Sequence, residues 1–149
     1  MNVQDTRIRA KKIIDAAVNA VFMTLDADGF PHPRTMWTAG MDDDFTIYFV
    51  TGKTLQKVKQ IESNPKVCAF WTQVEDGAIG WSYTLIKGHA LISENQALKD
   101  RFWVDELQEY FPGGKQDPNY VVIVVRPREL LIMDSHKYPL ERVEFQGSE

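Results

Sequence analysis

Hydrophobic residues near the start of the chain recur at the three- and four-residue spacing of an amphipathic helix. They are Ala10, Ile13, Ile14, Ala17, Val18 and Val21, and Asp5 is the expected N-cap. Further along, the pattern changes to short apolar runs rich in β-branched and aromatic residues, which is typical of strands. Strands are expected at residues 21–25, 34–38, 45–50, 67–72, 79–91, 120–125 and 130–133.

Turn and helix-ending residues separate these strands. Asp26-Ala27-Asp28-Gly29 and Glu75-Asp76-Gly77 predict turns, 40–44 reads as a polar loop, and Pro127 is expected to divide the last two strands. Two further helices are expected, one ended by Asn64-Pro65 and one starting at a capping box of Ser93 and Gln96. Because the strands occur mostly as neighbouring hairpins, the predicted fold is mainly β, an antiparallel barrel with peripheral helices.

Composition narrows the class of protein. The 149 residues are expected to form a single domain, residues 1–149, and the net charge of −4 argues against a nucleic-acid partner, which demands a basic face. No apolar run is long enough for a membrane span, and the polar N-terminus does not resemble a secretory signal. The single cysteine, Cys68, excludes an internal disulfide and lies in an apolar run typical of a buried, inert thiol. A cytoplasmic protein is therefore expected.

The segment 48–65 gives the first indication of a ligand. A strand leads directly into a helix here, and Lys53 and Lys57 flank the expected first helical turn. Basic residues are unfavourable at a helix N-terminus, which already carries a partial positive charge. They become favourable if an anion lies among them, held also by backbone N–H groups and the Thr51 and Thr54 hydroxyls. The segment predicts either a phosphate site or a helix start whose lysines extend into water.

No pattern in the chain indicates catalysis by a side chain. None of the serines lies in a Gly-x-Ser-x-Gly elbow. The histidines, His32, His89 and His136, are not at the spacing of metal ligands, and the acidic run 42–44 is typical of a solvated loop. Neither a metal site nor a catalytic residue is predicted.

Aromatic residues are the other unusual feature. Core packing explains most of them, and flat walls around a flat conjugated ligand would explain a few. Together with a phosphate site, they suggest a phosphorylated aromatic cofactor that brings its own chemistry. The residues are Trp37, Trp71, Trp81, Trp103, Tyr48, Phe49, Tyr83 and Phe102.

Several short motifs follow one another in a specific order. The first set is Thr24-x-Asp26-x-x-Gly29-x-Pro31-x-x-Arg34, Tyr48-Phe49-Val50-Thr51 with Lys57, and Asn64-Pro65-Lys66-Val67. The second set is Gly88 followed by Ala90, Trp103, Tyr110-Phe111-Pro112-Gly113-Gly114, and Asp117-Pro118-Asn119-Tyr120. The first set resembles the pyridoxamine-phosphate-oxidase-like FMN-binding split barrels, and the second resembles their small general-stress-protein branch. The resemblance covers residues 20–134.

The resemblance implies a six-stranded antiparallel split β-barrel, a homodimer, and FMN bound in clefts at the dimer interface. Arg34 matches the arginine that opens the family's cofactor strand, and Thr51 and Lys57 match phosphate-binding positions. Trp103 would pack near the isoalloxazine ring or the interface, and Lys53 is close enough to help. The cofactor-binding residues expected from the resemblance are Arg34, Thr35, Met36, Trp37, Val50, Thr51, Lys53, Lys57 and Trp103.

The chain also departs from the true oxidases that the resemblance names. They carry an arginine immediately before the matched lysine, where this chain has Gln56, and a lysine that aligns near Ala39. Their C-terminal Arg-x-His-x-Arg substrate motif does not occur before Glu149. The loss of basic groups that would clamp a phosphorylated pyridine argues against oxidation of vitamin B6 phosphates.

The expected function is an FMN-dependent oxidoreductase, reduced by NADH or NADPH, with an unidentified acceptor and a role in stress. A non-enzymatic flavin-binding protein that stores or senses the cofactor is the alternative from another class. A vitamin B6 oxidase with a reduced substrate site and a deazaflavin-dependent reductase remain further alternatives. No nucleic-acid or membrane partner is expected.

Overall fold

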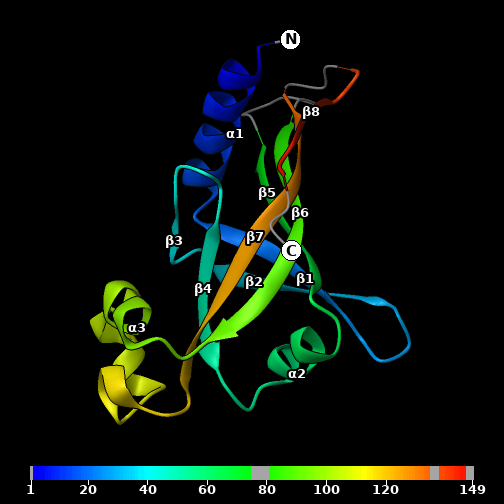
Figure 1. The fold of residues 1–149 in the computed structure, drawn as a ribbon. Coiled ribbons are helices and arrows are strands. Elements are labelled where there is room, and N and C mark those ends of the chain that lie inside the picture. Colours follow the sequence, from blue (N-terminus) through cyan, green and yellow to red (C-terminus); the bar gives the residue numbers. More distant parts are fainter. Residues whose placement is uncertain (1, 75–80, 135–137, 147–149) are drawn as a thin grey trace.

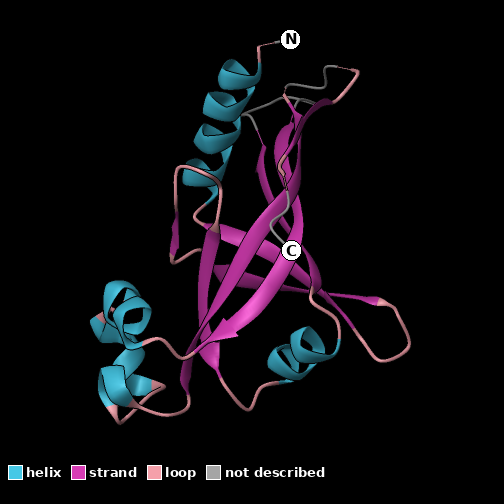
Figure 2. Ribbon diagram, viewed as in Figure 1, coloured by secondary structure: helices cyan, strands magenta, loops and turns pink. Residues whose placement is uncertain are grey.

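The computed structural model describes residues 2–74, 81–134 and 138–146 (Figure 1). These residues form mainly strands, with helices at the periphery, as predicted (Figure 2). In chain order the elements are α1 (Val3–Ala17), β1 (Asn19–Leu25), β2 (Pro31–Trp37), β3 (Gly40–Met41), β4 (Ile47–Gly52), α2 (Gln56–Ser63), β5 (Lys66–Val74), β6 (Trp81–Ser93), α3 (Gln96–Phe102), the 3₁₀ helices η1 (Asp105–Glu109) and η2 (Gly114–Gln116), β7 (Tyr120–Met133) and β8 (Glu141–Glu144).

The strands form one antiparallel sheet in the order β2-β1-β5-β6-β7-β4-β3, with β8 also paired to β7. The sheet curls strongly, so that β1 and β2 run across the direction of β4 and β7 (Figure 1). This half-barrel confirms the predicted split barrel. Besides the six longer strands, the described residues form two short strands that were not predicted from the sequence. These are β3, of two residues, and β8, of four.

The core fills the concave side of this sheet. Alternate residues of β1 point inward, so that Phe22 is fully buried while Val21 and Met23 are only half-buried on the outer face. Helix α1 packs against β5 and β6 and buries Ile13 and Ile14. Each such side chain contributes about 1.5–3 kcal/mol of hydrophobic stabilisation. The largest fully buried side chains include Trp71, Tyr120, Phe22, Phe49, Ile47, Ile86, Ile123, Leu130 and Ile132.

Strand β7 corrects the sequence prediction most clearly. The two strands expected on either side of Pro127 are one continuous strand, with a bulge opposite the Lys87–Gly88 step of β6. Pro127 is tolerated at the bulge because a residue there need not donate a ladder hydrogen bond. The bulge also requires a glycine on β6, since a Cβ on Gly88 would lie 2.4 Å from the Arg126 carbonyl oxygen.

The helix starts differ from the sequence prediction in detail. Asn2, rather than Asp5, caps α1, and its side chain accepts hydrogen bonds from two backbone N–H groups of the first turn. Asn95, rather than Ser93, caps α3 through a 3.2 Å bond from the Leu98 N–H. Helix α2 ends at Asn64, as expected.

Two of the predicted turns have different outcomes. The turn at residues 26–29 is present, with the Gly29 N–H 3.0 Å from the Asp26 carbonyl oxygen and Gly29 at a φ of +84°. The turn at residues 75–77 and the strand start at 79 lie outside the described residues. None of the helices in the described ranges is both long and apolar enough to span a membrane.

Candidate functional site

Helix α2 begins later than the sequence suggested. Its first residue is Gln56, so Lys53 lies in the preceding turn and Lys57 is the second helical residue. Lys53 is exposed, and its ammonium is 3.0 Å from the Glu94 carboxylate. Lys57 instead lies partly buried on the side of the helix that faces the sheet. The two lysines that the sequence placed together therefore have different surroundings.

Lys57 lies near a second cation, Arg34 of β2. The Lys57 ammonium donates a 3.2 Å hydrogen bond to the Thr51 hydroxyl at the end of β4. The Arg34 guanidinium, from the middle of β2, donates to the Phe22 carbonyl oxygen at 3.3 Å and to the Gln60 side-chain oxygen at 3.2 Å. We call Arg34 and Lys57 the basic pair.

Gln60 orients the arginine of the basic pair. It lies three residues after Lys57, so both side chains lie on one face of α2. The buried Gln60 oxygen accepts a hydrogen bond from the Thr24 hydroxyl as well as from Arg34. This role was not predictable from the sequence, because a glutamine within a polar helix does not show which way its side chain points.

Among the described residues, no carboxylate forms an ion pair with the basic pair. Burial lowers the pKa of Lys57, and the neighbouring charge of Arg34 lowers it further. Burial also lowers the pKa of Arg34. Within residues 2–74, 81–134 and 138–146, neither side chain takes part in an ion pair. Two partly buried like charges are unfavourable unless an anion joins them.

A cavity of about 420 Å³ lies beside the basic pair. Thr51, whose hydroxyl accepts a hydrogen bond from Lys57, is one of its lining residues. Trp37 at the end of β2 and Val50 to Gly52 at the end of β4 line one part of it. Its other walls come from apolar or aromatic side chains that follow these strands in the chain. These are Leu55, Leu107, Tyr110 and Phe111, together with the polar Asn119. No charged residue is among them, so the cavity is suited to a neutral, flat group.

Asn119 brings an unsatisfied polar atom to this cavity. Its side-chain oxygen is buried and has no hydrogen-bond partner among the described residues. The backbone of Asn119 is fixed, because its N–H donates to Asp117 at 2.9 Å and its carbonyl oxygen accepts from the Lys53 N–H at 2.8 Å. A buried acceptor left unpaired is costly, and a ligand N–H or O–H group would satisfy it.

The nine residues expected to bind a cofactor fall into four groups. Arg34 and Lys57 form the basic pair, and Trp37, Val50 and Thr51 line the cavity. Thr35 is exposed, while Met36 packs against the hydrophobic core. The other two lie elsewhere, with Lys53 paired to Glu94 and Trp103 packed edge-on against Tyr120 at 5.4 Å between ring centroids.

Several lining residues had no predicted role. Tyr110, Phe111 and Asn119 belong to the motifs of the general-stress-protein branch, so the sequence contained a signal for them, but only the fold brings them to Trp37 and Thr51. No group of three or more His, Cys, Asp or Glu residues in the described part of the chain could hold a metal ion.

The sequence of this chain is similar to a known protein family and to a bacterial protein. A sequence model of the family described as Pyridoxamine 5'-phosphate oxidase like matches residues 5–142. General stress protein 26 of Bacillus subtilis (strain 168) is 32% identical over 135 residues, which cover 91% of this chain and 93% of the relative.

Solved structures share the fold. The general stress protein 26 of Bacillus anthracis is 27% identical, with a TM-score of 0.77 over 94% of this chain and 98% of that chain. A protein related to general stress protein 26 from Clostridium acetobutylicum has a TM-score of 0.78, covering 96% of each chain. At 18% identity, the second likeness concerns the fold alone.

Proposed function

The chain belongs to the pyridoxamine 5'-phosphate oxidase like family, and we propose that it is an FMN-binding flavoprotein with oxidoreductase activity. The observation that carries this proposal is the basic pair, Arg34 and Lys57, beside an uncharged aromatic cavity. The pair is partly buried and forms no ion pair with any described residue. FMN combines the two features that such a site would take, a phosphate and a flat conjugated ring.

The phosphate of FMN would lie at the basic pair. Arg34 presents a planar guanidinium with several N–H donors, and Lys57 presents a compact ammonium next to the Thr51 hydroxyl. Charge-assisted hydrogen bonds from both cations would replace their mutual repulsion with attraction. Gln60 would keep the guanidinium in place while the anion binds.

The ring of FMN would lie in the cavity that adjoins Thr51. Trp37 supplies an aromatic wall, and the Asn119 amide, whose buried oxygen has no partner among the described residues, would turn to accept from a ring N–H. When bound, FMN would supply the redox chemistry, since the cavity lining holds no Asp, Glu, His, Lys or Cys. The side chains of this chain would bind the phosphate, orient the ring and exclude water.

The lining also bears on the substrate. To bind a phosphorylated pyridine, the protein would need basic side chains in addition to the basic pair, and the cavity lining supplies none. Gln56, at the position where the true oxidases carry arginine, is exposed and uncharged. We therefore expect negligible oxidation of pyridoxine or pyridoxamine phosphate, with NADH or NADPH as the source of electrons.

A homodimer is part of this proposal. On the outer face of the sheet, half-buried apolar side chains lie next to one another, including Phe70 and Tyr83 with ring centroids 5.0 Å apart. Val21, Leu85 and Leu131 extend this surface across neighbouring strands. A second copy of the chain would cover such a face, as the family resemblance implies.

FMN and riboflavin together provide the test. The apoprotein is titrated with each flavin while flavin fluorescence is followed, and the two dissociation constants are compared. FMN should bind at least tenfold more tightly, because riboflavin shares the ring but lacks the phosphate that the basic pair would hold. Equal affinities, or no binding of either, would rule out the proposed site.

Activity is a separate question from binding. Anaerobic addition of NADH or NADPH to the FMN-loaded protein should bleach the flavin absorbance. A flavin that neither nicotinamide bleaches would favour the storage or sensor function. If the purified protein shows the absorbance spectrum of a deazaflavin, its cofactor is a deazaflavin and not FMN.

A further inference from the structure

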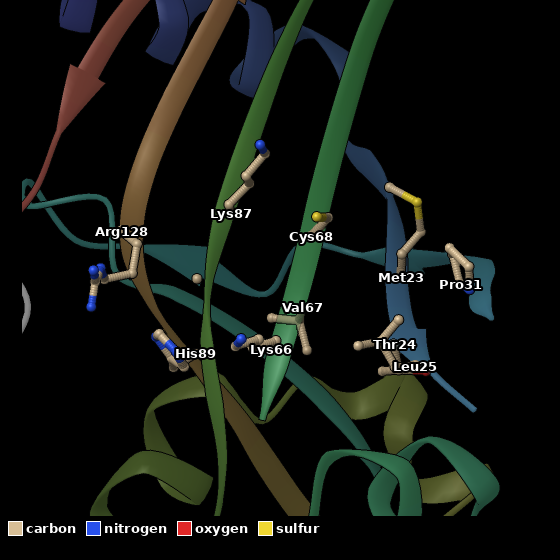
Figure 3. A pocket seen from close by; sticks show the side chains of 11 residues that line it. Met23, Thr24, Leu25, Pro31, Lys66, Val67, Cys68, Lys87, His89 and Arg128 are labelled. Atoms are coloured by element: carbon tan, nitrogen blue, oxygen red, sulfur yellow. The ribbon is translucent and has the colours of Figure 1, made fainter. Parts of the chain in front are cut away.

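A second cavity, of about 600 Å³, lies on the outer face of the sheet (Figure 3), and neither member of the basic pair lines it. Its lining residues come from five strands, β1, β2, β5, β6 and β7, and it has an apolar part and a basic part. Met23, Leu25 and Pro31 form the apolar part at the β1–β2 end. None of the residues assigned above to the phosphate or the ring of FMN lines it.

The basic part gathers positive charge in an acidic chain. Lys66, Lys87, His89 and Arg128 line the cavity, and no aspartate or glutamate does. Lys87 is compensated by Glu129, 3.5 Å away on the neighbouring strand. Across the described residues, Lys66 and Arg128 take part in no ion pair. The chain as a whole has a net charge of −4, so this local excess is not a reflection of composition.

The sheet register brings these groups together. Lys66 of β5 lies directly opposite His89 of β6, and the two side chains are next to each other in Figure 3. His89 in turn lies opposite the exposed Arg126 of β7. Lys66, His89 and Arg126 therefore form one row across three strands, with a cation on each side of the histidine.

The bulge in β7 supplies the remaining cation. Gly88 lies opposite Pro127 and Lys87 lies opposite Glu129, so Arg128 is the extra residue between them. Arg128 lines the cavity together with Lys87 and His89, and its guanidinium extends away from the Lys87 side chain (Figure 3). Bulges often redirect a side chain next to a functional site, and this one depends on a glycine at position 88.

From these observations we propose that the outer cavity is a second binding site, for a small organic anion with an apolar body, such as a fatty or aromatic carboxylate. The apolar body lies on Met23, Leu25 and Pro31, and the acidic group lies among Lys66, His89 and Arg128. The volume is in the range that small-molecule sites occupy. This site shares no residue with the phosphate and ring sites proposed for FMN.

The test uses two dyes with nearly the same rings on the full chain. Anilinonaphthalene sulfonate is an amphipathic anion, and N-phenyl-1-naphthylamine is its neutral counterpart. In the double variant Lys66→Gln and Arg128→Gln, the dissociation constant of the sulfonate should rise roughly tenfold, because two exposed charges are removed. The neutral dye should bind as before, which also shows that the variant is folded.

Control variants locate the effect. Lys12→Gln removes an exposed lysine of α1 and should leave the affinity for the sulfonate unchanged. Met23→Ser should weaken the binding of both dyes, because it alters the apolar part. Dodecanoate should displace the sulfonate at concentrations where inorganic phosphate does not.

Three results would overturn the proposal. The first is an unchanged sulfonate affinity in the double variant. The second is an equal loss for the neutral dye in that variant. The third is displacement by inorganic phosphate as effective as that by dodecanoate, which would show an anion patch without an apolar subsite.

Discussion

Replacing Lys57 with methionine tests the anion site most directly, because the change removes a charge and keeps most of the side-chain volume. A hydrogen bond to a charged group contributes about 1.5–3 kcal/mol, and the lower end applies because Lys57 is only partly buried. A loss of about 1.5 kcal/mol raises the dissociation constant for FMN about tenfold. Riboflavin, which lacks the phosphate, should bind to Lys57→Met and to the unaltered chain with equal affinity.

The stability of the apoprotein separates this role from a structural one. The substitution removes the 3.2 Å bond to Thr51, which costs roughly 1 kcal/mol. It also removes a buried charge that Arg34 repels, and this gain offsets the loss. The free energy of unfolding should therefore change by less than about 1 kcal/mol, measured by urea denaturation without flavin.

The matched control is Lys59→Met on the same helix. Lys59 is exposed and forms no ion pair with any other described residue. Its substitution should leave FMN affinity unchanged. The reasoning is refuted if the two variants bind FMN equally well, or if Lys57→Met weakens FMN and riboflavin by the same factor.

Three other predictions concern the same site and its assembly. The pKa of Lys57 is lowered from 10.5, so its ammonium deprotonates at a lower pH in the folded chain than in the unfolded chain. As the pH rises into the alkaline range, FMN affinity should fall and the unliganded protein should become more stable, because the unfolded chain binds the proton more tightly. Lys57→Met should show neither effect. Asn119→Leu removes the buried acceptor and should weaken FMN and riboflavin alike, by about fivefold for roughly 1 kcal/mol, in the same fluorescence titration. Light scattering should give twice the 17.1 kDa of one chain, and a monomer that still binds FMN would contradict a shared site.

Features that depend on neighbouring residues were predictable from the sequence. The apolar spacing of α1 and the alternation of β1 reflect which side of each element faces the core. The turn at Asp26 to Gly29 was recognisable because its last residue needs a positive φ, which glycine adopts readily. The same local reasoning predicted a helix between Gly52 and Asn64, although not its first residue.

Features that depend on distant residues were not predictable. Strand β7 continues through Pro127 because β6 supplies a glycine at the bulge, some forty residues earlier in the chain. The pairing of Lys53 with Glu94, and of Trp103 with Tyr120, likewise depends on how the α3 region returns to the sheet. Periodicity gives the direction of a side chain within its element, but it does not give the side chain's partner.

The position of the candidate site follows from the incomplete closure of the barrel. Among the described strands, β2 pairs only with β1, and β4 lies near the opposite end of the sheet. Where the sheet curls, these two strands come close without forming a ladder, and Trp37 and Val50 then line one cavity. A closed barrel would fill this space with paired backbone. The split therefore leaves room for a flat ligand between two strand ends, and α2, which directly follows β4, brings Lys57 to the same place.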